Sequence, residues 1–109
     1  MNDTSLVYVT FATHEEAARV ASAVVEERLA ACVNLHAPIR SFYWWEGKVQ
    51  DEQEVAVVMK TQSTRVAELI DRVKALHSYD CPCVVALPIQ AGNPAFLDWI
   101  RSETASGAR

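Results

Sequence analysis

The chain has 109 residues, of which 50% are hydrophobic, and a formal net charge of −4, which together predict one compact domain over residues 1–109. Its ten Lys and Arg residues are scattered, so nucleic acid and anionic membranes, which need clustered positive charge, are not expected as partners. No apolar run approaches about 20 residues, the length that crosses a bilayer, and the first residues do not resemble a signal peptide, so we expect a cytoplasmic protein.

The first predicted elements are a strand and a helix. Residues Ser5 to Phe11 are rich in Val, Leu and Tyr without a breaker, which is typical of a strand. Residues Thr13 to Glu16 have the S/T-x-x-E form of a capping box, in which the Thr hydroxyl and the Glu carboxylate both bond amides at a helix start. This helix is predicted to end near Leu29.

A long β-hairpin is predicted from Ala31 to Thr61, with its bend at Glu46-Gly47-Lys48, because two apolar, β-branched runs flank a glycine that can take a positive φ. Pro38 is expected to interrupt the first arm, since proline cannot donate to a sheet ladder. The first arm carries the aromatic run from Phe42 to Trp45, more ring surface than one small domain buries easily. The hairpin therefore predicts an oligomer.

Lys60 is expected near the end of the second arm, on a strand face that is otherwise apolar. A buried lysine there needs a polar partner, whereas a snorkelling side chain keeps its ammonium in water. Both alternatives stay open.

The remaining chain predicts a helix, a strand and a short helix. Apolar residues recur at helical spacing from Val66 to Leu76, and Cys83 to Ile89 reads as a fourth strand, with prolines at its ends that favour an edge position. Asn93-Pro94 is typical of an N-cap followed by proline in the first turn. The tail, residues 102–109, is expected to fray.

These elements predict a ferredoxin-like α+β sandwich of βαββαβ order, with a long central hairpin and a short C-terminal helix. In such a fold two helices cover one face of a four-stranded antiparallel sheet. Packing between subunits would cover the other face.

Four segments of the chain resemble the CutA family of divalent-cation-tolerance proteins. They are LAACVNL, SFYWWEGKV with the following EVAVVMKT, HSYDCPCVVALPI and GNPAFLDWI. The resemblance implies a homotrimer with an architecture similar to the PII signalling proteins, and a function in tolerance of copper and other divalent metals. It also implies a ligand cleft between subunits, at positions that correspond to Trp45, Glu46, Lys60, His77 and Tyr79. For Tyr43 and Trp45, plain interface packing is the alternative.

Copper ligands proposed in the family correspond here to Phe11, Leu76 and His77, so only His77 matches by residue type. The sequence offers a second donor set in His77, Asp80, Cys81 and Cys83, because thiolates and imidazole suit Cu(I) or Zn(II). The metal-site prediction is therefore His77, Cys81 and Cys83, with copper or another divalent metal as the ion. The alternative is that both cysteines are small buried side chains of a strand. Cys32 is expected in the core, and with an odd count of three cysteines we expect reduced thiols.

No enzyme is predicted. The sequence shows no legible Ser-His-Asp constellation, no glycine-rich phosphate loop and no H-E-x-x-H motif. Besides metal homeostasis, two functions stay open: a PII-like sensor that binds a small metabolite at Lys60 and Tyr79, and a structural trimer that scaffolds partner proteins.

Overall fold

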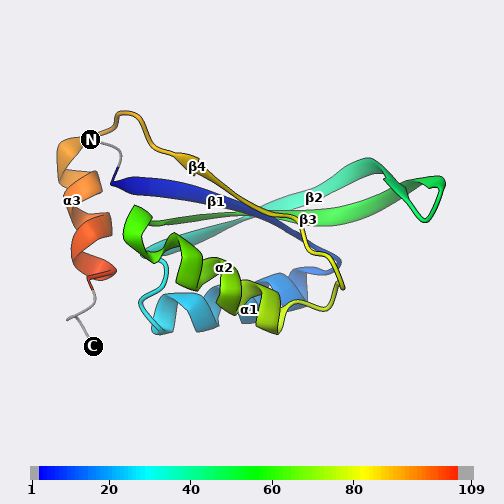
Figure 1. The fold of residues 1–109 in the computed structure, drawn as a ribbon, viewed down its shortest axis with the longest axis horizontal. Coiled ribbons are helices and arrows are strands. Elements are labelled where there is room, and N and C mark those ends of the chain that lie inside the picture. Colours follow the sequence, from blue (N-terminus) through cyan, green and yellow to red (C-terminus); the bar gives the residue numbers. More distant parts are fainter. Residues whose placement is uncertain (1–2, 106–109) are drawn as a thin grey trace.

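The computed structural model describes residues 3–105, except the side chain of Ala37. Its elements follow the predicted order (Figure 1). They are β1 (Thr4–Phe11), α1 (His14–Glu26), β2 (Cys32–Trp45), β3 (Lys48–Gln62), a 3-10 turn (Ser63–Arg65), α2 (Val66–Leu76), β4 (Val84–Pro88) and α3 (Pro94–Glu103). The predicted α+β fold is confirmed.

The four strands form one sheet in the order β2-β3-β1-β4, and every neighbouring pair is antiparallel. The strand β4 lies at an edge, as its prolines predicted. In β2, at the other edge, the pairing with β3 shifts between Leu35 and Pro38. The predicted interruption at Pro38 is thus a local irregularity of an otherwise continuous edge strand.

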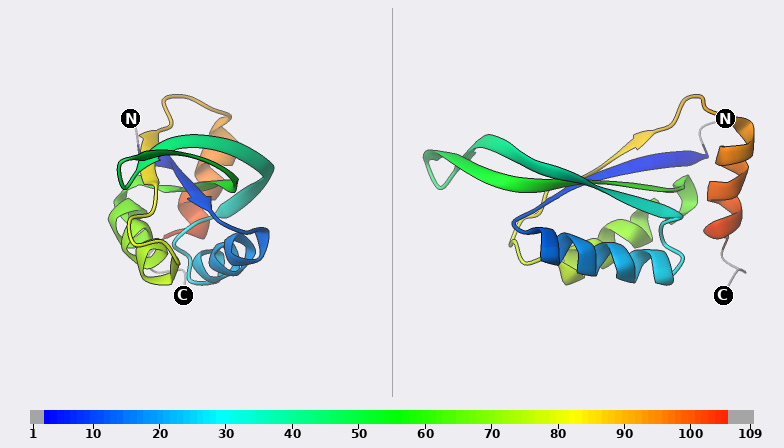
Figure 2. Two further views of the ribbon diagram at one scale, coloured as in Figure 1. Left: turned by 90° about the vertical axis from the view of Figure 1, so that its right-hand side faces the viewer. Right: turned by 180° about the vertical axis from the view of Figure 1, so that it is seen from behind.

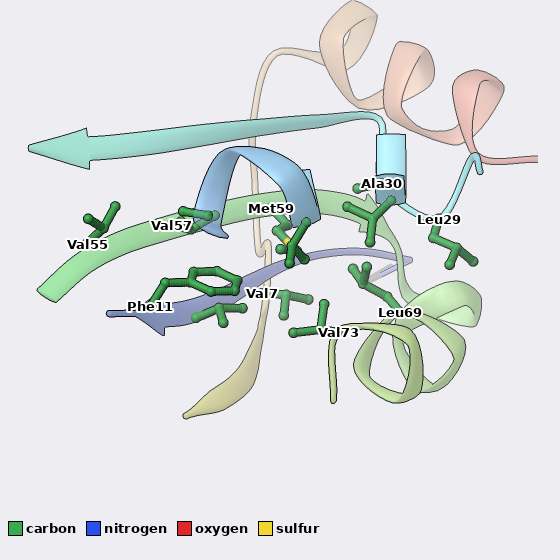
Figure 3. Close-up of a cluster of buried hydrophobic side chains, with 13 residues drawn as sticks. Val7, Phe11, Leu29, Ala30, Val55, Val57, Met59, Leu69 and Val73 are labelled. Atoms are coloured by element: carbon green, nitrogen blue, oxygen red, sulfur yellow. The ribbon is translucent and has the colours of Figure 1, made fainter. Parts of the chain in front are cut away.

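Helices α1 and α2 lie together against one face of the sheet (Figure 2). The core forms there because alternate residues of β1 and β3, such as Val7, Val57 and Met59, point toward the helices and are fully buried (Figure 3). Leu69 and Val73 of α2 meet them from the helical side. Burying each such side chain stabilises the fold by roughly 1.5–3 kcal/mol.

The opposite face of the sheet has no helix over it. We call it the open face, and its apolar members are Leu6, Tyr8, Val58, Val85 and Leu87. Val85 and Leu87 are 49% and 51% exposed, and the other three are half-buried. A single chain therefore leaves a continuous apolar strip in contact with solvent.

The hairpin extends well beyond the rest of the sheet (Figure 1). The last β1–β3 pair is Phe11 with Val55, so residues 39–54 pair only with each other and form what we call the hairpin ribbon. At its bend Glu46 and Gly47 both have positive φ, 52° and 76°, the conformation of a tight hairpin turn. The predicted bend is confirmed. Phe42 and Trp44 on the ribbon are 63% and 74% exposed.

Helix α1 differs from the capping-box prediction. The Thr13 hydroxyl accepts a 3.1 Å hydrogen bond from the Glu16 amide, as expected. The buried Glu16 carboxylate, however, bonds to Ser78 rather than to the start of its own helix. The helix also stops at Glu26 rather than near Leu29, and the chain turns at Arg28, whose φ is 64°.

The prediction of a frayed tail was wrong for residues 102–105. Helix α3 continues to Glu103, whose carboxylate lies 2.6 Å from a guanidinium nitrogen of Arg28, and Thr104 is fully buried. The carbonyl of Thr104 accepts hydrogen bonds from the side chains of Gln62 and Arg65. Residues 106–109 lie outside the described part of the chain.

Candidate functional site

A hollow of about 670 Å³ lies where the hairpin ribbon, the end of β1 and residues 78–83, the segment leading into β4, come together. One wall is a single face of the hairpin ribbon. Alternate residues of a strand share a face, and residues 41, 43 and 45 of β2 pair with residues 52, 50 and 48 of β3 on that face. The lining residues are Thr10, Ser41, Tyr43, Trp45, Gln50, Glu52, Glu54, Ser78, Tyr79, Asp80, Cys81 and Cys83.

The charge of the hollow has one sign. Its lining includes the carboxyl groups of Glu52, Glu54 and Asp80 and the thiols of Cys81 and Cys83, and no Lys, Arg or His. Walls of one sign concentrate counter-ions. The hollow is therefore suited to a cation and unsuited to an anion.

Two tyrosines hold two of these carboxylates in place. The Tyr79 hydroxyl donates a 2.9 Å hydrogen bond to Glu54, which is only 8% exposed, and the Tyr43 hydroxyl donates one of 3.2 Å to Glu52. Burial and then the neighbouring Glu54 carboxylate raise the pKa of Tyr79 well above its usual range. Burial and then Glu52 raise the pKa of Tyr43. Both phenols therefore remain protonated donors to the carboxylates.

Cys81 and Cys83 are free thiols, and both are exposed, so the expectation that they are buried side chains of a strand was wrong. They precede β4 instead of lying in it. Partial desolvation first, and then the charge of Glu54, raise the pKa of the Cys83 thiol. Cys32, at the start of β2, is half-buried and does not line the hollow.

His77 is buried beneath the hollow rather than exposed in it. Its Nε2 donates a 2.7 Å hydrogen bond to the Thr10 carbonyl, and its Nδ1 accepts one of 3.1 Å from the Tyr79 amide, assignments that follow from the partners. The ring stacks on Phe11 with a centroid distance of 4.5 Å. His77 thus positions the start of the 78–83 segment, and both of its nitrogens are engaged.

The predicted metal group of His77, Cys81 and Cys83 is not assembled within this chain. Among residues 3–105, no three or more His, Cys, Asp and Glu side chains are grouped so that they could hold a metal ion. The two thiols do share the hollow.

The predicted cleft residues lie in four places. Trp45 and Tyr79 line the hollow, whereas Glu46 lies at the hairpin bend and His77 lies behind Tyr79. Lys60 lies six residues beyond Glu54 along β3, about 20 Å away, where its ammonium donates to the Asn34 side chain. Lys60 is half-buried, and its ammonium has a polar partner at an exposed position.

Sequence reasoning missed Glu52 and Glu54 as site residues. Their alternation with Gln50 on one face of the second hairpin arm was the available signal. The sequence does not show that residues 78–83 lie beside this face of the hairpin and form the other side of the hollow.

The fold and the hollow define a small α+β domain with a protruding hairpin and an acidic hollow at its base. The family model for "CutA1 divalent ion tolerance protein" matches residues 5–103, and the chain belongs to this family. The predicted family resemblance is confirmed.

Relatives match along most of the chain. The divalent-cation tolerance protein CutA of Archaeoglobus fulgidus is 50% identical over 96 residues, which cover 88% of this chain and 93% of that protein. Human protein CutA is 45% identical over 102 residues, covering 94% of this chain but 57% of the human protein.

Solved structures agree with the fold. CutA1 from Oryza sativa superimposes with a TM-score of 0.92 at 43% identity and covers 96% of both chains. The Archaeoglobus fulgidus structure, described as a periplasmic divalent cation tolerance protein, gives 0.90 at 48% identity, covering 93% of this chain and 98% of that one. In the described part of this chain, no helix has the length and apolarity that crossing a membrane requires.

Proposed function

We propose that this chain is a homotrimeric cation-binding protein of divalent-metal and copper tolerance, and that the hollow is one wall of a cleft between subunits. The observation that carries the proposal is the composition of the hollow: three carboxyl groups and two thiols, with no basic side chain among the lining residues. Oxygen and sulfur donors of this kind serve divalent and soft metal ions.

Assembly is part of the proposal because one chain leaves much apolar surface uncovered. The open face and the rings of Phe42 and Trp44 are exposed in a single chain. Large exposed apolar surfaces are typical of subunit interfaces. A trimer of PII-like architecture would bury these surfaces against neighbouring copies.

A neighbouring subunit would also complete the site. Within the described residues of one chain, fewer than three donor side chains converge. Glu54 and Glu52, held by Tyr79 and Tyr43, would supply this chain's share of the ligands. The remaining donors would come from the adjacent copy.

A metabolite sensor is less well supported. The lining residues offer no positive charge to an anionic metabolite, and Lys60, the cation expected to bind one, lies far along β3 and donates to Asn34. We propose no catalytic activity, and a cytoplasmic location remains a prediction that cell fractionation would check.

Titration with Zn(II) and with Cu(II) tests the proposed function. We expect the wild type to bind at the trimer mass measured by light scattering, and Glu54→Gln to weaken binding of both ions at least about 10-fold. Glu15→Gln, at an exposed carboxylate of α1, is the matched control and should bind like the wild type. A folded monomer at micromolar concentration, or equal affinity of Glu54→Gln and the wild type, would contradict the proposal.

A further inference from the structure

We infer that Cys81 and Cys83 form a two-thiolate site for a soft monovalent cation of the Cu(I) class. This inference rests on the proposed cation binding in the hollow and specifies which ion this chain's own donors suit. The two cysteines flank Pro82 and both line the hollow.

Both thiols are available to a ligand. Cys81 and Cys83 are exposed and free, and residues 81–83 belong to no helix or strand. The two cysteines are two residues apart along the chain and line the same hollow, so both can serve as ligands of one ion. Pro82 between them fixes its own φ, which limits the conformations that must be ordered on binding.

The number of donors selects the ion. Zinc takes four ligands in protein structural sites, and no three donor side chains converge in the described residues of one chain, so zinc would need donors from a second subunit whereas Cu(I) would not. His77, the nearest imidazole in sequence, has both nitrogens bonded to backbone groups. Cu(I) is satisfied by two thiolates in a linear arrangement, and thiolates select it over harder ions.

The charge of the walls favours a cation over a disulfide. Glu54, Glu52 and Asp80 share the hollow with the thiols. Carboxylates attract a cation but disfavour a free thiolate, which is the nucleophile of thiol–disulfide exchange. Binding would release one proton from each thiol to solvent, so that Cu⁺ and two thiols give a complex of charge −1 and two protons, with no change of oxidation state.

Cys32 provides a matched control within the same chain. It is half-buried at the start of β2 and pairs with Lys60 across the sheet, outside the hollow. A general affinity of cysteines for Cu(I) would involve Cys32 as well. A specific site would not.

The test is competition for Cu(I) against a chromogenic Cu(I) chelator, anaerobically and with reductant, on the full chain. We expect one ion per chain. Cys81→Ser and Cys83→Ser should each lower the affinity at least about 100-fold, and Cys32→Ser should leave it unchanged. X-ray absorption of the Cu(I)-loaded protein should show two sulfur neighbours and no nitrogen. Circular dichroism checks that each variant is folded.

Equal affinity of the wild type and the Cys81→Ser/Cys83→Ser double variant would overturn the inference, as would an absorption spectrum with three or more ligands. The two proposals fail differently. If Glu54→Gln loses Zn(II) and Cu(II) binding but still coordinates Cu(I), the result supports both the proposed function and the two-thiolate site. Zn(II) and Cu(II) binding without any Cu(I) binding overturns only the thiolate site, and Cu(I) binding without either divalent ion overturns only the proposed function.

Discussion

The carboxylate of Glu16, in the first turn of α1, accepts hydrogen bonds of 2.7 Å from the Ser78 amide and 2.9 Å from the Ser78 hydroxyl. The two residues are 62 positions apart in the chain. The contact fastens the start of α1 to the segment that carries Tyr79, Cys81 and Cys83 into the hollow. Helix packing and site geometry are thereby coupled.

Glu16→Ala should therefore be destabilising. It removes a charged acceptor and leaves the Ser78 amide without its partner, which costs about 2 kcal/mol of unfolding free energy. Urea unfolding at fixed protein concentration measures the loss. Glu15→Ala, at the neighbouring exposed carboxylate, should change stability by less than about 0.5 kcal/mol. Equal effects of the two variants would contradict the contact.

His77→Phe separates the two functions of that ring. Phenylalanine preserves the stacking on Phe11 but leaves the Thr10 carbonyl and the Tyr79 amide without partners. We expect a loss of about 2–3 kcal/mol. The exposed His14→Phe is the control. In the wild type, ¹⁵N NMR at about pH 8 should report the tautomer protonated at Nε2; an Nδ1-protonated ring would refute the assignment.

The hairpin bend has one unfavourable residue. Glu46 has a φ of 52°, a conformation that asparagine adopts more readily than glutamate, and Gly47 follows at 76°. Glu46→Asn should slow amide hydrogen exchange in the hairpin ribbon. Gly47→Ala should speed it, since a Cβ at positive φ costs about 1 kcal/mol. Apart from Gly47 itself and its two chain neighbours, no heavy atom of the described residues lies within 4 Å of a Cβ added at Gly47, so the variant tests the backbone conformation. Identical exchange in both variants would argue against this turn.

Arg65 anchors the end of α3. It is buried, its Nε donates a 2.9 Å hydrogen bond to the Thr104 carbonyl, and its Nη1 lies 2.8 Å from Glu68. Arg65→Met retains the packing volume and removes the bonds, so we expect a loss of about 2 kcal/mol and faster hydrogen exchange in α3. Arg19→Met, at an exposed position of α1, should leave α3 unaffected. Unchanged exchange in α3 would show that packing alone holds the helix.

The ion pair of Asp3 with Arg101 predicts a dependence of stability on pH. The hydrogen bond from the Arg101 guanidinium holds the pKa of Asp3 below its usual value. A lowered folded-state pKa contributes stability above the unfolded pKa, and this is lost as the pH falls through the folded value. Asp3→Asn should thus be slightly less stable than the wild type at about pH 7, and the difference should shrink as the pH falls through the lowered pKa of Asp3 in the folded protein. A difference that grows on acidification would contradict the assignment.

The helices and strands could be predicted from the amino-acid sequence, because the signals for them are local. Each of these signals depends on residues a few positions apart. Examples are the strand alternation around Val57, the bend at Gly47, and the helix caps formed by the side chains of Thr13 and Asn93. The four segments that resemble the CutA family are also short stretches of sequence. They predicted the membership in this family that the match of its model to residues 5–103 confirms.

The partners of the polar side chains, in contrast, depend on the three-dimensional fold. Glu16 fits a capping box by spacing, yet it bonds Ser78, since the fold brings a distant amide within reach. The sequence offers His77 and Lys60 as candidate ligand residues. In the fold, His77 hydrogen-bonds to the Thr10 carbonyl and Lys60 hydrogen-bonds to the Asn34 side chain. Hydrogen bonds and charges are satisfied by whatever lies nearby in space, and that proximity is set by packing between segments far apart in the chain.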